Sequence, residues 1–256
     1  MADDNGYVKQ VTANGISTIE FFHPQSNSLP AVLLKELAAT FINAGKDDAI
    51  KVIILQSAGE GAFCAGASFE ELTSITNNAE GLAFFSGFAH LINALKNCPK
   101  LIIGRIHGKC AGGGVGLAAA CDYALAATGA SIKLSELAIG IGPFVVGPVV
   151  ERKIGVSAFS QLAIDASSWR SSEWALQKGL FANVCNDKNA LDEAVNKLAV
   201  TLQQSSPDAM ASIKKIIWEG TGHWNELLLE RAAISGSLVL SSYTKAAITA
   251  FKVKKN

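Results

Sequence analysis

The sequence has little charge, no charge imbalance and no long hydrophobic run, and each absence excludes a class of protein. Only 17% of the 256 residues are charged, and 22 basic side chains balance 22 acidic ones. Without a run of either sign, the chain lacks the electrostatic footprint of a protein that binds nucleic acid or a membrane surface. Its most apolar stretch, 137–150, contains prolines and is shorter than the roughly 18 residues of a membrane span. We expect the partner to be a small molecule or another subunit.

Metal ligands and targeting signals are also scarce. The five cysteines are widely scattered, with no CxxC spacing and no histidine at ligand distance, so we interpret them as free buried thiols. The four histidines do not cluster with carboxylates or cysteines, which argues against a metal site and against a nucleophilic triad. The first residues, Met-Ala-Asp-Asp, lack the basic and apolar start of a secretory signal. The expected location is therefore the cytoplasm.

What the sequence does have is a hydrophobic content of 49%, typical of compact globular proteins, and a hydrophobic period that changes regularly along the chain. Residues 16–22 alternate like a strand, and helical spacing follows Ser28 and Pro30, which predict a cap and a first helical turn. Apolar runs at 51–56 and 101–106 are further strand candidates. The alternation predicts an α/β domain with parallel crossovers.

Beyond residue 190 the pattern becomes almost wholly helical. Helical spacing covers 191–204, 207–218, 224–239 and 244–253. Ser205-Ser206-Pro207 predicts the break between the first two of these helices. We therefore expect an α/β core over residues 1–190 and a helical C-terminal region over residues 191–256.

Two loops of small residues each follow a strand candidate: 61–68 (GAFCAGAS) and 108–116 (GKCAGGGVG). Residues without bulky side chains let a ligand approach the backbone closely, so that exposed N–H groups can bind a developing oxyanion. Two such loops could hold one oxygen atom between them. The alternative is that each loop is only a tight turn.

A dinucleotide-binding motif is a rival interpretation of the second loop. Gly114, Gly116 and Ala119 fit the GxGxxA pattern, and Glu136 supplies an acid about twenty residues later. The motif follows two complete strand–helix units, however, whereas this fingerprint normally opens the first unit. Its position in the chain weighs against the interpretation.

Four segments of the chain, taken in order, resemble the enoyl-CoA hydratase/isomerase family, the crotonases. They are FCAGAS at 63–68, GKCAGGGVGLAAACDYALA at 108–126, SIKLSELAIGIGP at 131–143 and AFKVKK at 250–255. The first two resemble the signature loops of the family, the third its glutamate-bearing segment and the fourth its C-terminal end. The resemblance implies a crotonase-type superhelix of ββα units, with a helical C-terminal region that assembles homotrimers or dimers of trimers.

The resemblance also implies roles for individual residues. The substrate would be an acyl-CoA thioester, with coenzyme A as part of the substrate and no metal or separate cofactor. Backbone N–H groups of Ala67 and Gly113 would form an oxyanion hole for the thioester carbonyl, and Glu136 would be the acid/base. The adenine end of coenzyme A would lie against Cys64, Ala65, Gly66 and Ser68, while Phe251 and Lys254 would reach the pantetheine and phosphates bound to a neighbouring subunit.

Glu136 has two interpretations. As a base in an apolar neighbourhood it should have a raised pKa. The alternative is a carboxylate at a helix start that only caps backbone N–H groups, which the sequence Ser135-Glu136 would allow.

The chain departs from the family pattern at the residues that activate water. Gly116 stands where hydratases carry the first of two glutamates, which leaves Glu136 alone. One carboxylate suffices to move a proton between two carbons of one acyl chain. SELAIGIGPFVV resembles the 3,2-enoyl-CoA isomerases, so the sequence favours double-bond isomerisation. Hydration stays open, since Glu70, Glu71 or an ordered water could replace the missing acid.

Other departures and other reactions leave further alternatives. Ser68 stands where the family usually has Asp, His107 where Asn is common, and Phe144-Val145 replaces a glycine-rich continuation. Hydration of branched or methylglutaconyl-type substrates, acyl-CoA decarboxylation and thioester hydrolysis need the same oxyanion hole. A non-catalytic acyl-CoA binding protein is the alternative of a different class.

Overall fold

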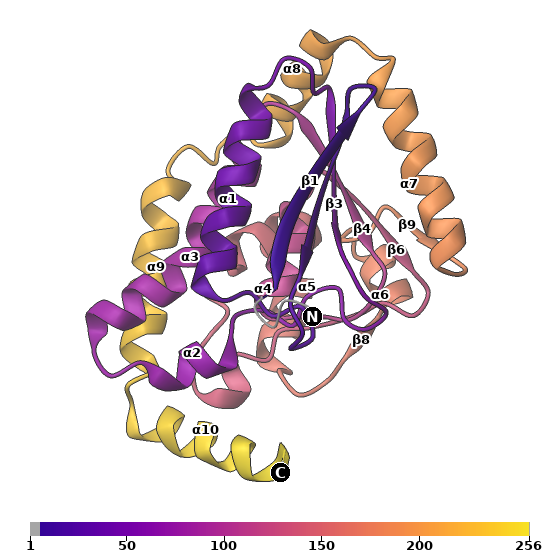
Figure 1. The fold of residues 1–256 in the computed structure, drawn as a ribbon. Helices are drawn as coiled ribbons and strands as arrows, with labels where there is room; N and C mark the ends of the chain where they lie inside the picture. Colours follow the sequence, from indigo (N-terminus) through magenta and orange to yellow (C-terminus); the bar gives the residue numbers. More distant parts are fainter. Residues whose placement is uncertain (1–5, 256) are drawn as a thin grey trace.

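The computed structural model describes the backbone of residues 6–255 and the side chains of residues 6–250. Its main feature is a sheet of strands in the order β1-β2-β3-β4-β6-β9, in which every pairing is parallel except that of β1 with β2 (Figure 1). The strands are β1 (Tyr7–Ala13), β2 (Ile16–Phe22), β3 (Val52–Ser57), β4 (Leu101–Ile106), β6 (Tyr123–Ala127) and β9 (Asn183–Cys185).

Helices cover both faces of this sheet, which is why β3 and β4 are apolar along most of their length. On one face, α1 (Ala31–Lys46), α3 (Asn78–Asn97) and α9 (Trp224–Leu238) enclose the larger core. On the other face, α7 (Lys188–Gln203) packs Leu191, Val195 and Ala199 against the sheet. Residues on both sides of position 190 thus share one core, and the oligomerisation role of the C-terminal region stays a prediction.

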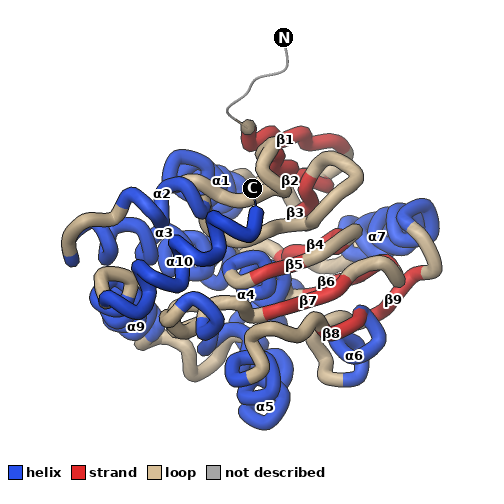
Figure 2. The backbone as a smooth tube through the Cα atoms, turned by 90° about the horizontal axis from the view of Figure 1, so that it is seen from below, coloured by secondary structure: helices blue, strands red, loops and turns tan. Residues whose placement is uncertain are grey.

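A second, small sheet lies beside the ends of the main strands and leads into the glycine-rich segment (Figure 2). It contains β5 (Cys110–Ala111), β7 (Ser131–Lys133) and β8 (Arg170–Ser171). Helix α4 (Gly113–Ala120) begins directly after β5, and the short 3-10 helix η1 (Leu137–Ile139) follows β7. The remaining helices are α2 (Phe69–Ser74), α5 (Gly147–Ile164), α6 (Ser172–Gln177), α8 (Pro207–Ile217) and α10 (Ser242–Lys255).

The structure confirms the strands at 16–22 and 101–106, the parallel crossovers and the helix break at Ser206, whose Oγ accepts a hydrogen bond from the N–H of Ala209. The prediction that Ser28 caps the following helix is wrong. The Ser28 hydroxyl pairs with Nδ1 of His23 at 3.1 Å, and the carboxylate of Glu71 accepts the N–H of Ala31 at the start of α1. The carboxylate of Glu71, which is distant in the sequence, thus caps α1 in place of Ser28.

A buried ion pair fixes the end of α4 to the C-terminal helices. Asp122 follows α4, and its carboxylate accepts hydrogen bonds from Nζ of Lys214 at 2.6 Å, Nε1 of Trp218 at 2.8 Å and the N–H of Ile102 at 2.8 Å. The side chains of Asp122 and Lys214 are each only 3% exposed. Both oxygens of the buried Asp122 carboxylate thus accept hydrogen bonds, which offsets part of the cost of burying its charge.

The structure contains, in the residues that it describes, no helix long and apolar enough to cross a membrane.

Helices α3 and α9 approach each other so closely that glycine is required on both sides. A β-carbon added at Gly81 would lie 2.6 Å from the carbonyl oxygen of Gly236, and one added at Gly236 would lie 2.8 Å from the backbone of Gly81. These contacts are with backbone atoms, which cannot rotate away. The two helices would have to separate to admit a side chain.

We therefore predict that Gly81→Ala lowers the free energy of unfolding by about 2–3 kcal/mol through overpacking. Gly222→Ala is the matched control, because nothing lies within 4 Å of a β-carbon added there. It should change the free energy by less than about 0.5 kcal/mol. Denaturant unfolding followed by circular dichroism measures both, and equal effects in the two variants would contradict the prediction.

Candidate active site

Two loops far apart in the sequence are joined by backbone hydrogen bonds. The loop after β3 (58–68) and the loop after β4 (107–112) meet at a parallel bridge between Cys64 and Cys110. The N–H of Cys64 donates to the carbonyl of Lys109 at 3.2 Å, and the N–H of Ala111 donates to the carbonyl of Cys64 at 2.9 Å. The two small-residue loops singled out in the sequence therefore form one unit.

Ala67 and Gly113 lie on either side of this junction. Gly66 has a φ of 89°, and a β-carbon there would lie 3.1 Å from the backbone nitrogen of Gly113. Gly113 is the first residue of α4, so its N–H has no partner within the helix and lies at the positive end of the helix dipole. Within the described chain, the N–H groups of Ala67 and Gly113 donate no hydrogen bond. Both are free to bind an oxygen atom.

A phenylalanine supports the second of these amides from behind. The ring of Phe88, from α3, packs against Gly113 and leaves no room for a β-carbon, which would lie 2.3 Å from Cζ of the ring. Phe88 is itself only 6% exposed. Its buried ring and the bridge between the loops together fix the position of the Gly113 N–H.

The carboxylate of Glu136 lies next to the same helix start. Gly112, the residue before Gly113, has a φ of 51°, and a β-carbon added to it would lie 3.0 Å from Oε1 of Glu136. Glu136 is the residue before η1, but its side chain makes no capping hydrogen bond to that helix. The expected cap of η1 is therefore absent, although the backbone N–H groups of Glu136 and Ser135 lie close enough to the carboxylate to lower its pKa.

The environment of Glu136 favours its neutral form. Its Oε2 atom is buried and has no hydrogen-bond partner in the described structure, although the residue as a whole is partly exposed. Burial raises the pKa of this carboxyl to about 7, while the backbone N–H groups of Glu136 and Ser135 partly oppose the rise. No charged side chain contributes to this shift. Glu136 can therefore both accept and return a proton near neutral pH.

We predict that Glu136 titrates near pH 7, well above the ordinary value of 4.5. Because the folded state holds this proton more tightly than the unfolded chain does, the contribution to stability is present below pH 4.5 and is lost as the pH rises through 7. Carboxyl-carbon NMR of protein labelled with ¹³C-glutamate measures the titration, and Glu136→Gln assigns the signal. A midpoint near 4.5 would contradict the prediction.

The loop predicted to hold the adenine end of coenzyme A presents backbone atoms rather than side chains for contact with a ligand. The thiol of Cys64 is fully buried, and burial raises its pKa to about 12. Ser68 is buried and caps α2 by accepting a hydrogen bond from the N–H of Glu71. Ala65 is exposed, and Gly66 has its N–H beside the Cys64 sulfur. Coenzyme A contacts at this loop stay a prediction, and the side chains of Phe251 and Lys254 lie outside the described residues.

The alternative acids do not lie beside Glu136 as free carboxylates. Glu71 is engaged at the start of α1, and Glu70 is exposed. Both act electrostatically on His23, whose pKa burial nevertheless lowers. His107 is 3% exposed with no partner for either ring nitrogen among the described residues, and burial, then the charge of Arg105, lowers its pKa to about 4. His107 is therefore neutral at physiological pH.

The structure does not favour the dinucleotide interpretation, because the glycines of the motif make room for protein atoms. A β-carbon added at Gly114 would lie 2.1 Å from the carbonyl oxygen of Cys64, and one added at Gly116 would lie 2.5 Å from Cγ1 of Val146, where the fingerprint would use glycine to admit a ligand. The sequence did not predict that Gly112 would lie against Glu136 or that Phe88 would pack on Gly113. The run of glycines and the phenylalanine cluster at 84–88 marked both segments, but no local pattern indicated these two contacts.

The family model described as enoyl-CoA hydratase/isomerase matches residues 11–251 of this chain. The chain belongs to the enoyl-CoA hydratase/isomerase family. It is 30% identical to a probable enoyl-CoA hydratase of Bacillus subtilis over 94% of this chain and 93% of the relative. The crystal structure of an enoyl-CoA hydratase from Bacillus halodurans superposes with a TM-score of 0.86 at 25% identity, covering 95% of this chain and 99% of that one. The predicted crotonase fold is thereby confirmed.

Members of the enoyl-CoA hydratase/isomerase family with different reactions are similarly distant. Human mitochondrial methylglutaconyl-CoA hydratase is 33% identical over 76% of this chain. Human mitochondrial Δ(3,5)-Δ(2,4)-dienoyl-CoA isomerase is 29% identical over 73% of it. This chain spans 58% and 60% of the lengths of these two relatives. The family thus contains lyases and isomerases that act on acyl-CoA substrates, and the reaction of this chain depends on its own site residues.

Proposed function

We propose that this protein is an acyl-CoA isomerase that moves a double bond by a proton transfer through a thioester enolate. Ala67 and Gly113 bind the thioester oxygen through their N–H groups, and Glu136 carries the proton. Each donor contributes on the order of 3 kcal/mol to stabilising the transition state. The reaction uses coenzyme A only as part of the substrate and needs no metal. Among the described residues, no group of three His, Cys, Asp or Glu side chains is arranged to hold one.

The proposed step balances without a second acid. On a 3-enoyl-CoA, Glu136 removes a proton from C2, and the electrons of the C–H bond form an enolate with its negative charge on the thioester oxygen. The C3–C4 π electrons then bond the returning proton at C4, and the enolate collapses to a C2–C3 double bond. The carboxyl of Glu136 ends deprotonated, as it began. A group with a pKa of about 7 serves in both directions.

One observation supports isomerisation over hydration: among the described residues, no second carboxylate acts on the pKa of Glu136. In the described part of the chain no charged side chain shifts its pKa, whereas a second carboxylate within a few ångströms would raise it by repulsion. Of the substitutes suggested by the sequence, Glu71 is engaged at α1 and Glu70 is exposed. A single proton carrier matches an intramolecular transfer.

We predict that the wild-type protein converts a 3-enoyl-CoA into the 2-trans-enoyl-CoA. Glu136→Gln, which keeps the shape of the side chain but cannot accept a proton, should lower kcat at least about 100-fold with little change in substrate binding. Absorbance of the conjugated enoyl thioester measures turnover, and calorimetry with the saturated acyl-CoA measures binding. Isomerisation that survives Glu136→Gln would exclude Glu136 as the base.

Hydration is the second candidate, favoured by the 33% identity to methylglutaconyl-CoA hydratase. The same assay with a 2-trans-enoyl-CoA and with a branched glutaconyl-type CoA, followed by mass spectrometry, separates hydration, decarboxylation and hydrolysis. Fast addition of water to either substrate would contradict the isomerase proposal. Tight binding of all the thioesters without turnover would favour the non-catalytic alternative.

We further propose that the chain assembles as a homotrimer or a dimer of trimers, in the cytoplasm. Large hydrophobic side chains are exposed near the site end of the molecule, and partner subunits would cover them. They include Leu82, Leu137, Ile234, Leu238 and Tyr243, with exposures from 37% to 68%. Light scattering coupled to gel filtration should give the mass of three or six chains of 26.8 kDa. The mass of a single chain would contradict the proposal.

A further inference from the structure

Two glycines at the start of helix α4 contact other residues of this region. Gly112 immediately precedes the helix and Gly116 lies within it, and the N–H of Gly116 donates to the carbonyl of Gly112 at 3.4 Å, so the two glycines lie one turn apart. The carboxylate of Glu136 lies against the first glycine. The side chain of Val146 lies against the second, with its Cγ1 2.5 Å and its Cβ 2.7 Å from the place of a β-carbon on Gly116.

From this arrangement we propose that Val146 determines the reaction: it occupies the space beside Gly116, one helical turn from the glycine that Glu136 contacts, in which a second acid would stand to act on water. The inference rests on the proposed function. An acidic side chain at position 116 would start one turn beyond Gly112 and would need the space that Val146 fills. Val146 fills that space with an apolar isopropyl group and thereby selects acyl-CoA substrates whose double bond moves without addition of water.

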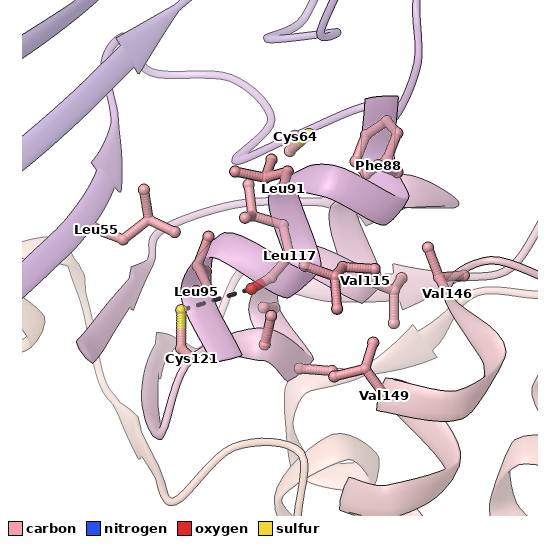
Figure 3. Close-up of a cluster of buried hydrophobic side chains, with 14 of the residues drawn as sticks. Leu55, Cys64, Phe88, Leu91, Leu95, Val115, Leu117, Cys121, Val146 and Val149 are labelled. Atoms are coloured by element: carbon pink, nitrogen blue, oxygen red, sulfur yellow. Dashed lines mark hydrogen bonds between the residues drawn. The ribbon is translucent and has the colours of Figure 1, made fainter. Parts of the chain in front are cut away.

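Val146 is held firmly in this place. It is 4% exposed, immediately precedes α5 and belongs to the same buried cluster as Val145 and Val149, which are 5% and 0% exposed. Figure 3 shows Val146 and Val149 in this cluster. Its carbonyl accepts the N–H of Val150 at 3.0 Å. A β-branched side chain has little rotameric freedom, so Val146 cannot turn aside to admit an acid or a water molecule.

The chemistry of hydration explains why this position matters. Adding water across a C2–C3 double bond places a hydroxyl on C3 and a proton on C2, so the attacking water must lose a proton while C2 gains one. A water molecule in a buried site needs two to four polar partners to stay there. Val146 offers none. Isomerisation requires only the proton carried by Glu136, and the apolar side chain of Val146 does not impede it.

The decisive variant is Gly116→Glu combined with Val146→Gly, which supplies the acid and the room for it. We expect hydration of a 2-trans-enoyl-CoA to rise at least about 100-fold over wild type, the lower end of a general acid–base contribution. Gly116→Gln combined with Val146→Gly is the matched control of the same shape without an acid, and it should show no rise. Gly116→Glu alone should fold poorly, because its side chain meets Val146.

A second measurement keeps the inference testable if the double variant does not fold. Val146→Gly alone opens a cavity beside Gly116. Formate added to the assay can enter this cavity and supply a carboxylate that is not attached to the chain. Hydration should then increase with formate concentration in Val146→Gly. It should not increase in wild type or in Val149→Gly, in which another buried valine of the same cluster is removed.

The outcomes separate this inference from the proposed function. If folded Val146→Gly and the double variant still isomerise a 3-enoyl-CoA but gain no hydration, the role of Val146 is overturned and the isomerase proposal stands. If wild type isomerises nothing but the double variant gains hydration, the proposed function is overturned and the role of Val146 stands. Wild type that already hydrates as fast as the double variant overturns the role of Val146.

Discussion

The site depends on one constraint, the backbone-to-backbone contact of two loops that end parallel strands. Hydrogen bonds at the Cys64–Cys110 bridge join them, and Gly66 and Gly114 pack against the opposite backbone. No residue with a side chain fits at these two positions without moving the other loop. The two free amides are therefore placed by the main chain of the fold itself, which makes their geometry independent of side-chain rotamers. The buried Asp122–Lys214 ion pair anchors the other end of helix α4, the helix that begins at Gly113.

Some parts of the molecule could be predicted from the sequence, and others could not. Strands 16–22 and 101–106 and the long helices have clear hydrophobic periods, and runs of small residues marked both loops before their contact was known. Strand β1, the small sheet and the cap of α1 left no comparable signal. The cap is a carboxylate forty residues away, Glu71, because the nearby Ser28 is paired with His23. Capping rules consider only residues next to the helix start, whereas the carboxylate that caps α1 comes from a distant part of the sequence.

Glu136 shows the limit of prediction within the site. A raised pKa follows from an apolar neighbourhood, but the sequence could not say that the carboxylate would lie over Gly112 or that Oε2 would be left without a partner. A buried, unpartnered carboxylate oxygen costs stability, since burial without hydrogen bonds penalises its charged form. Strongly shifted pKa values cluster at functional sites, and the raised pKa of Glu136 therefore supports the proposed role of this residue in proton transfer.

Two glycines of α4, Gly113 and Gly116, each make room for a different side chain of the protein. At Gly113 the missing side chain admits the ring of Phe88, which packs behind the free amide, and at Gly116 it admits Val146. In both places glycine makes room for a protein side chain rather than for a ligand. The absence of an acid at position 116 is thus coupled to the presence of Val146 at another place in the sequence. A change at only one of the two positions leaves either a steric clash or a cavity, so a gain of water activation requires that both change together.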